Sequence, residues 1–424
     1  MNNIENIVKE RTCTGCGTCY SICPVSCIAI EENVKEGIFL PSIDMEKCTD
    51  CGLCIKVCPQ TDLIKNEFLN KEQFYGKSLL NFYGYSENKN IRYDSSSGGL
   101  ITSLAIFSLK NRLVDGVIAV RSKSDNPLRF ESIICRTEED ILSSRGSKYC
   151  PVSVNTILKN IVEEDKKEST YMFIGLPCHL KGLDKFTSIY PELENKIKYK
   201  MALFCSHISN YHGTEFILKK WRISLTNVNK LRYRGNGWPG AMSIIEKNGQ
   251  ETSIYSGTYW GKYFANYFFT PKYCFLCDDF FGLESDISFG DAWLDKFNED
   301  KEGVSLGIVR SDKGKKLMME CKENKAIFFD ELSKKEIEKS QYGQVLFKNI
   351  LFPDRKRVLL KLPLRQKIHL SFKCYNKFMI FNSYLSGKKM FKSLLIIFPD
   401  FIEKLYFKIL NKIKTLLMKK NSSL

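Results

Sequence analysis

The chain has 424 residues, enough for two or three domains with hydrophobic cores, and its 43% hydrophobic and 26% charged residues are typical of an ordinary soluble protein. The chain has 17 cysteines, but a disulfide scaffold is not expected, because such scaffolds are short secreted chains and MNNIENIVKE has no apolar signal segment. The net charge of +16 is uneven: residues 1–70 carry six Lys and Arg against ten Asp and Glu, whereas residues 365–424 carry 13 against two. We expect a cytoplasmic protein with metal-binding cysteines and a basic tail.

The first 70 residues contain one cysteine pattern twice, 35 residues apart. Both copies read C-x2-C-x2-C-x3-C-P, which is typical of bacterial two-cluster ferredoxins. In these proteins the fourth cysteine of each run binds the other cluster. The first predicted 4Fe–4S site is Cys13, Cys16, Cys19 and Cys58. The second is Cys48, Cys51, Cys54 and Cys23.

Zinc is the alternative for these eight cysteines, but zinc sites usually pair two short C-x2–4-C units across a longer gap. Gly15, Gly17 and Gly52 permit the tight path of the chain around each cluster. Cys27 is surplus, and we expect it to be a small buried side chain.

After a linker at about 60–74, strand and helix patterns alternate, which predicts an α/β core. Strands are expected at 81–85, 115–120, 171–176 and 198–204, and a helix begins near residue 100. Ser95, Ser96, Ser97, Gly98 and Gly99 stand at the start of that helix. Two interpretations remain open: the serines cap the helix, or the free amides and glycines bind a phosphate group.

Two further segments are rich in glycine and cations, SRGSKY (144–149) and RYRGNGWPG (232–240). An anionic, aromatic ligand such as a flavin dinucleotide suits both, and two ordinary surface loops are the alternative. The candidate cofactor-binding residues here are Ser147, Lys148, Arg234, Gly235 and Gly237.

A third group of cysteines is dispersed along the chain. Cys178 and Cys205 each follow a predicted buried strand, and Cys274 and Cys277 form a CxxC pair. Because α/β folds build sites where strands end, these four thiols can hold one more 4Fe–4S cluster. A zinc site that includes His179 or His207, and four unrelated buried cysteines, are the alternatives.

Six motifs occur in one order: SSSGGL, GSKY, GLPCHLKGL, a cysteine after MALF, RYRGNGWPG, and CFLC followed by SDISFGDAW. In this order the chain resembles the family of coenzyme F-420 hydrogenase/dehydrogenase beta subunits over roughly residues 75–345. The resemblance implies an FAD-containing oxidoreductase with an additional 4Fe–4S cluster beside the flavin. It implies that the cluster ligands are Cys178, Cys205, Cys274 and Cys277. It implies that the flavin-phosphate contacts are Ser96, Ser97, Gly98 and Gly99.

The resemblance also implies roles at the reacting centre. Lys148 would be a cation of the flavin pocket, able to stabilise charge on a reduced ring, and Asp291 would line the same site. The chain departs from the family at Leu294, where GDFWG-type motifs end in glycine, and it lacks an arginine before SDIS. Both departures leave the substrate open: family members act on deazaflavin coenzyme or a chlorophyll derivative, and many bacterial relatives are linked to polysaccharide synthesis.

Residues 346–424 form a basic tail in which Phe, Leu and Ile recur at helical spacing opposite lysines. Pro399 and Asp400 interrupt its longest apolar run, so a transmembrane helix is not expected. The tail predicts either an amphipathic helix on an anionic membrane surface or a helix docked on the core. Nucleic-acid binding is not expected, because no recognition module accompanies the charge.

Together these observations predict an α/β (α+β) flavoprotein core with a ferredoxin-like domain before it and a helical tail after it. The expected domains are 1–70, 75–345 (parts about 75–160 and 165–345) and 346–424. Electrons would pass between a ferredoxin-like or deazaflavin partner, three 4Fe–4S clusters, FAD and a small-molecule substrate. A non-catalytic electron-delivery subunit is the main alternative, and a zinc-stabilised binding module without flavin is a third.

Overall fold

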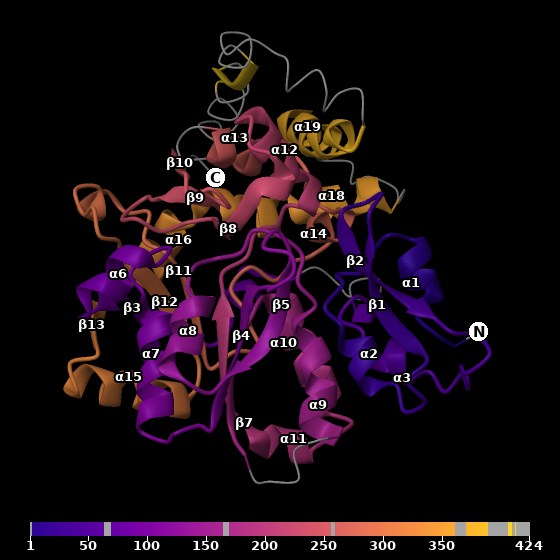
Figure 1. Ribbon diagram of the computed structural model, residues 1–424, viewed down its shortest axis with the longest axis horizontal. Coiled ribbons are helices and arrows are strands. Elements are labelled where there is room, and N and C mark those ends of the chain that lie inside the picture. Colours follow the sequence, from indigo (N-terminus) through magenta and orange to yellow (C-terminus); the bar gives the residue numbers. More distant parts are fainter. Residues whose placement is uncertain are drawn as a thin grey trace.

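The computed structural model describes residues 2–62, 69–163, 169–255, 259–360, 370–388, 406–408 and 412. An eight-stranded mixed sheet forms its centre (Figure 1). The strand order is β13 (Ile327–Glu331), β3 (Leu80–Ser86), β12 (Ser305–Val309), β11 (Ile287–Asp291), β7 (Ile197–Leu203), β6 (Tyr171–Gly175), β4 (Gly116–Ser122) and β5 (Phe130–Cys135). The four strands predicted from sequence correspond to β3, β4, β6 and β7, which confirms the α/β prediction.

Four neighbouring strands of this sheet, β4, β6, β7 and β11, are parallel, and the strands on either side of them are antiparallel. The parallel strands are mostly buried, as in sheets that carry helices on both faces. Their carboxyl ends therefore lie at one edge of the sheet, where α/β folds build binding sites.

Helices cover both faces of the sheet (Figure 1). On one face, α7 (Leu100–Lys110) and α15 (Asp312–Glu323) bury Leu104 and Leu317 against Phe82 and Met201. On the other face, α9 (Ile157–Glu163) and α10 (Pro177–Thr187) contribute to a second core around Phe173. The remaining helices of the core are α5 (Lys71–Tyr75), α6 (Lys89–Asp94), α8 (Glu138–Ser144), α11 (Glu192–Lys196), α12 (Tyr211–Lys220), α13 (Tyr259–Ala265), α14 (Lys272–Phe275), α16 (Lys334–Ser340) and α17 (Tyr342–Val345).

A smaller antiparallel sheet lies beside α12 and α13, with the order β10 (Glu251–Tyr255), β9 (Ala241–Glu246), β8 (Val228–Arg232). Its apolar residues Met242 and Ile244 share a core with Phe216 and Tyr263 of the two helices. This unit contains the RYRGNGWPG segment between β8 and β9, and so fixes where that segment meets the main sheet.

The N-terminal unit is a β-hairpin with three short helices (indigo, Figure 1). Its elements are α1 (Glu5–Lys9), α2 (Thr18–Ile22), β1 (Ile28–Asn33), β2 (Ile38–Ile43) and α3 (Leu53–Lys56). Gly17 and Gly52 start α2 and α3 with φ of 89° and 75°, a left-handed conformation that favours glycine. Each cysteine run therefore passes through a tight turn directly into a helix.

Specific contacts dock this unit on the core. The Asn155 amide nitrogen donates to Cys16 O at 2.9 Å, and Ser153 Oγ donates to Gly15 O at 2.6 Å. Arg129 pairs with Glu32 of β1 at 2.6 Å. Because apolar residues of both units also share one core, the cysteine-rich segment is a packed part of the molecule.

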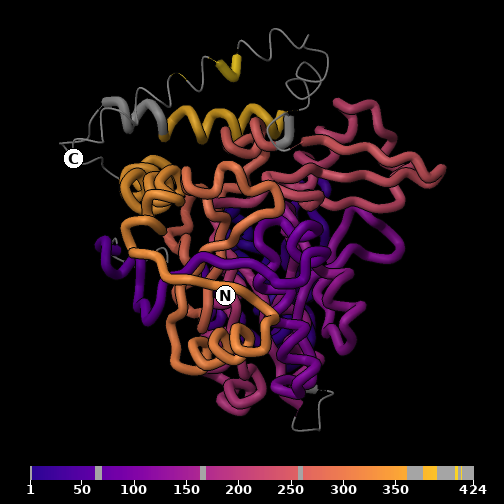
Figure 2. Tube along the Cα trace, turned by 90° about the vertical axis from the view of Figure 1, so that its left-hand side faces the viewer, coloured from indigo at the N-terminus to yellow at the C-terminus, as the bar shows by residue number. Residues whose placement is uncertain are grey.

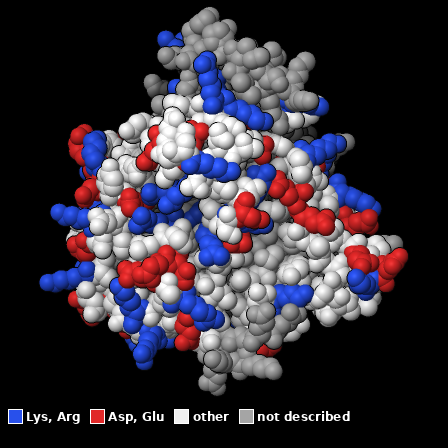
Figure 3. Space-filling view, viewed as in Figure 1, with Lys and Arg blue, Asp and Glu red and all other residues white. Residues whose placement is uncertain are grey.

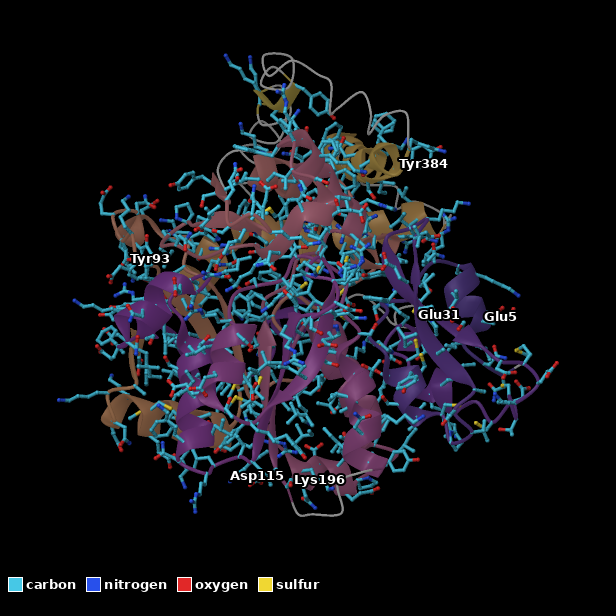
Figure 4. All side chains as sticks on the ribbon, viewed as in Figure 1. Glu5, Glu31, Tyr93, Asp115, Lys196 and Tyr384 are labelled. Carbon is cyan, nitrogen blue, oxygen red and sulfur yellow. The ribbon has the colours of Figure 1, made fainter. Side chains whose placement is uncertain are left out.

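The described parts of the tail pack on the core. They include the π-helical segment Leu346–Ile350, α18 (Phe352–Leu359) and α19 (Leu370–Ser386). Ser383 Oγ donates to Thr270 O at 2.6 Å, and Asn382 Nδ2 donates to Asn266 O at 3.0 Å. Figure 2 shows α19 along the outside of the molecule, and Tyr384 on it is 60% exposed (Figure 4). For these residues the docked alternative holds.

Most of the segment predicted to face a membrane lies outside the described residues, at 389–405, 409–411 and 413–424. Within the described residues, none of the helices combines the length and apolar character that crossing a bilayer requires. On the face in Figure 3, basic and acidic side chains are intermixed over the coloured part of the surface.

Candidate functional site

A large cavity lies at the edge where the parallel strands end. It has about 1520 Å³ of empty space, counting the part that opens to solvent. Val120, Gly175, Leu203 and Asp291, one residue from each of the four parallel strands, line it. The cavity thus occupies the position that the topology of an α/β sheet favours for a ligand.

Four cysteines converge at one end of this cavity. Cys178 follows β6 at the start of α10, and Cys205 follows β7. Cys274 lies in α14, and Cys277 follows it. All four line the cavity. Burial raises the pKa of Cys178 well above its ordinary value, and the nearby thiols of the other three raise it further. The structure therefore brings the dispersed cysteines of the sequence together.

A buried phenol beside these thiols fits a bound group. Tyr273 is 4% exposed and lines the cavity, and its hydroxyl has no hydrogen-bond partner among the described residues. An unsatisfied buried hydroxyl costs roughly 1–3 kcal/mol, which a sulfur acceptor of an iron–sulfur cluster would offset. Four convergent thiols and an unpartnered donor are the arrangement expected around such a cluster.

The two ferredoxin-type sites are also assembled as the crossover of the fourth ligand predicts. One small cavity is lined by Cys13, Cys16, Cys19 and Cys58. Another is lined by Cys23, Cys48, Cys51 and Cys54, and also by Cys27. Cys27 is buried, as expected, but its Sγ lies 3.4 Å from Cys23 Sγ, so it borders the second site directly.

The first ferredoxin site and the third cysteine group are neighbours. Cys16 is among the thiols whose charge raises the pKa of Cys178. Burial raises the pKa of Tyr273 well above its ordinary value, with further contributions from Cys274, Cys178 and Cys13 in that order. Thr14 lines both the first ferredoxin site and the larger cavity, so the two sites adjoin.

The histidines of the zinc alternative are engaged otherwise. Both ring nitrogens of His207 contact protein atoms, Ser206 Oγ at 2.9 Å and Phe264 O at 3.0 Å. His179 Nδ1 accepts from the Leu176 amide at 3.2 Å, and burial lowers its pKa to about 4. Among the described residues, no three or more His, Cys, Asp and Glu side chains surround a single metal ion.

The other end of the cavity is formed by the serine-glycine segment, where the capping interpretation proves wrong. Gly99 begins α7 with φ of 75° and no side chain caps the helix. Ser95 Oγ and Ser97 Oγ donate instead to Ile91 O at 2.6 Å and Val304 O at 2.7 Å. The first amides of α7 are thus left without side-chain caps beside the cavity, as an anion-binding helix end requires.

Gly98 has a different role from the one predicted. A Cβ atom there would lie 2.6 Å from Gly84 O and 2.7 Å from Ser305 N. Glycine is required at this position because the chain packs closely against the sheet, and Gly98 does not line the cavity. Ser96, Ser97 and Gly99 do line it.

The SRGSKY turn meets this segment although 51 residues separate them. The Ser147 amide donates to Ser96 Oγ at 2.7 Å, and Arg145 pairs with Asp94 at 2.5 Å. Lys148 lines the cavity, and its ammonium donates to the carbonyl oxygens of Ser144 and Arg145. Burial lowers the pKa of Lys148 to about 7, so its charge is sensitive to what binds beside it.

The buried Arg234 pairs with the partly exposed Asp291, which lines the cavity. Arg234 Nη1 lies 2.6 Å from Asp291 Oδ2 and donates to the Tyr149 hydroxyl at 3.0 Å, while its Nη2 has no partner among the described residues. Asp291 lines the cavity, but Arg234, Gly235 and Gly237 do not. These glycines allow close packing instead, because a Cβ at Gly235 would collide with the Arg232 guanidinium and one at Gly237 would lie 2.7 Å from the Lys301 carbonyl oxygen.

Three residues that line the site were not predicted from the sequence motifs. Lys348 lines the cysteine end from the segment after the core, and Asp279 lies two residues beyond Cys277. Thr14 enters the cavity from the first ferredoxin run. Tyr273 adjoins the CxxC pair, and that adjacency is the one clue by which it could have been noticed.

Family models match three ranges of this chain. Residues 81–159 match "Coenzyme F420 hydrogenase/dehydrogenase, beta subunit N-term", and residues 168–335 match the model for the carboxy-terminal part of the same beta subunit. Residues 12–61 match "4Fe-4S dicluster domain". All twelve cysteines predicted to bind iron fall within these ranges.

Several curated proteins are similar. Coenzyme F420-dependent sulfite reductase of Methanocaldococcus jannaschii is 25% identical over 78% of this chain and 49% of its own length, so the chain spans about half of that relative. Coenzyme F420 hydrogenase subunit beta of Methanococcus voltae is 24% identical over 54% of this chain and 75% of its own length. One subunit of the F(420)H(2) dehydrogenase of Methanosarcina mazei is 23% identical over 69% and 81%.

One solved structure has the same fold. A chain of the F420-reducing [NiFe] hydrogenase complex from Methanosarcina barkeri aligns with a TM-score of 0.54 and 19% identity, covering 70% of this chain and 99% of that one. This likeness shows a shared fold. The chain belongs to the family of coenzyme F420 hydrogenase/dehydrogenase beta subunits and carries an N-terminal 4Fe–4S dicluster domain.

Proposed function

We propose that this protein is an iron–sulfur flavoprotein oxidoreductase that passes electrons between a soluble carrier and a small-molecule substrate. One observation carries the proposal. The same cavity is lined by four cysteines and by an uncapped helix start with cations beside it. The relatives named for coenzyme F420 make a deazaflavin the first candidate for the carrier or the substrate. A ferredoxin-like partner remains the other candidate.

The residues of the two ends support two different bound groups. Cys178, Cys205, Cys274 and Cys277 would hold a third 4Fe–4S cluster. The amides at the start of α7, with Ser96 and Lys148, would hold the phosphates and ring of FAD. Bound FAD would supply the exchange between single electrons and a two-electron hydride.

The protein's own groups have defined tasks in this arrangement. Lys148 would place a positive charge beside the flavin ring when an electron-rich state develops there. Asp291, held by Arg234 at 2.6 Å, would face the substrate side of the cavity as an acceptor of hydrogen bonds. The apolar wall that includes Leu100, Ala119 and Ile174 would exclude water from the ring.

A second candidate function is a non-catalytic subunit that delivers electrons to a larger complex. It is favoured by the names of two relatives, which describe them as subunits of a hydrogenase and of a dehydrogenase. Turnover of a reduced carrier by the isolated protein would favour the enzyme, and reduction of the clusters without turnover would favour the subunit. A cytoplasmic location, contact of the tail with membrane and a link to polysaccharide synthesis remain predictions.

Cofactor analysis tests the proposal. Protein purified without oxygen should contain about twelve irons and about one flavin per chain. Cys274→Ser should remove about four irons and leave the electron paramagnetic resonance (EPR) signals of the ferredoxin clusters unchanged. Cys321→Ser is a matched control, because Cys321 is a fully buried cysteine of α15 that does not line the cavity. Equal iron in the two variants would mean that the third cluster does not exist.

A further inference from the structure

The cysteine end of the cavity contains a buried cation from outside the family-matched ranges. Lys348 lies in the π-helical segment Leu346–Ile350 and is 1% exposed. Its Nζ donates to Cys277 O at 3.1 Å and to Cys274 O at 3.3 Å, 71 and 74 residues away in the sequence. The segment after the core thus returns to the two cysteines of the CxxC pair.

Lys348 also lines the same cavity as Cys178 and Cys205. Arg355 stands behind it, fully buried, with its guanidinium donating to Phe275 O at 2.8 Å and Phe347 O at 2.6 Å. Of these two buried cations, Lys348 is the one that lines the cavity with the thiols.

The first ferredoxin site has a comparable lysine in a different electrostatic state. Lys185 donates to Cys58 O at 3.1 Å, but its ammonium also lies 2.8 Å from Asp62, which neutralises it. Burying an ammonium is costly in free energy unless an anion lies beside it. A cluster with four thiolate ligands is such an anion, because the thiolate charge exceeds that of the cube.

From these contacts we infer that Lys348 is a positioning residue that raises the reduction potential of the third cluster above the value it would have with a neutral neighbour. The inference rests on the proposed function, since it requires that cluster. Reduction adds one negative charge to the cluster, and a fixed cation in a medium of low dielectric constant stabilises the reduced state more than the oxidised one. Electrons arriving from the first ferredoxin cluster would therefore be held next to the flavin.

The orphaned hydroxyl of Tyr273 acts in the same direction. Tyr273 lines the same cavity as the cysteines, and its hydroxyl has no hydrogen-bond partner among the described residues. A hydrogen bond from this hydroxyl to a cluster sulfur would also favour the reduced state. Its removal in Tyr273→Phe should lower the potential less than the loss of a full charge does.

An EPR-monitored redox titration of the full-length, cluster-loaded protein tests the inference. Lys348→Gln removes the charge and Lys348→Arg keeps it, and Lys185→Gln is the matched control at the first ferredoxin site. We expect Lys348→Gln to shift the reduction equilibrium of the third cluster by roughly tenfold or more, which is about 59 mV to lower potential for a one-electron couple. Lys348→Arg should retain the wild-type value, and Lys185→Gln should leave the third cluster unchanged.

The other outcomes also separate the two proposals. Loss of the third cluster in Lys348→Gln, with retention in Lys348→Arg, would support the role of the charge. Equal potentials in wild type and Lys348→Gln would overturn the inference while the proposed function stands. Loss of the cluster in both variants would overturn it too, because charge would then not be what matters. Wild-type protein that has the iron of two clusters alone would remove the proposed function and the inference together.

Discussion

Arg129 is expected to hold the ferredoxin unit on the core, and its removal should loosen that unit selectively. Its guanidinium makes a bidentate pair with Glu32 of β1, at 2.7 and 2.6 Å, and a further contact with Glu215 of α12 at 3.1 Å. It also lies 4.1 Å from the centre of the Tyr211 ring. Arg129→Met keeps the apolar contact with the ring and removes the charge.

The size of the effect follows from partial exposure. Removing one partner of a fully buried pair costs about 3–5 kcal/mol, whereas an exposed pair contributes about 0–1 kcal/mol. The side chains of Arg129, Glu32 and Glu215 are 15%, 25% and 23% exposed, so water can reach the two carboxylates that remain. We therefore expect a loss of about 2–3 kcal/mol, which raises the open population of the unit by roughly one and a half to two orders of magnitude.

Hydrogen exchange measured by mass spectrometry is the appropriate assay. The amides of β1 and β2 should exchange faster by that factor in Arg129→Met, and those of β4 in the main sheet should not change. Arg121→Met is a matched control, because Arg121 pairs with Glu131 on the surface with both side chains at least a third exposed. If the amides of β1 and β2 exchange at the same rate in the two variants, the reasoning about this pair is wrong.

Three other predictions concern the site itself. Because burial lowers the pKa of Lys148 to about 7, its side chain is charged below that pH and neutral above it. The affinity for FAD, measured by quenching of flavin fluorescence, should therefore fall in wild type as pH rises from about 6 to about 9. It should not change with pH in Lys148→Met. Cys27→Ala should keep full iron content although Cys27 borders the second ferredoxin site, and loss of about four irons would make it a ligand. Asn155→Ala leaves Thr18 Oγ1 and His179 O without the buried amide that contacts both, at 2.8 and 2.9 Å, and should cost about 1–3 kcal/mol in urea unfolding; an unchanged midpoint would show that water replaces the amide.

Local patterns predicted the parts of this protein that are local in the chain. The two cysteine runs place three ligands within seven residues, so spacing alone indicates a cluster. The strands at 171–176 and 198–204 are largely apolar runs, and the structure has β6 and β7 there. The order of six motifs was enough to indicate the family.

Other predictions failed because the partner of a residue lay far along the chain. The serines before α7 were candidate helix caps, but Ser97 bonds Val304, 207 residues away, and the helix start is left open. Gly237 was a candidate cofactor contact, but it packs closely against the carbonyl oxygen of Lys301, 64 residues away. No local pattern carries such information.

The amino-acid sequence by itself determined which residue types could bind iron and where strands and helices would form, because both depend on neighbours within a few positions. Tertiary structure alone decided that Cys178, Cys205 and the CxxC pair meet, and that Lys348 returns to them from 71 residues beyond Cys277. The physical reason is that parallel strands deliver their ends to one edge of the sheet. Burial there then determines which thiols, hydroxyls and cations face one another without water.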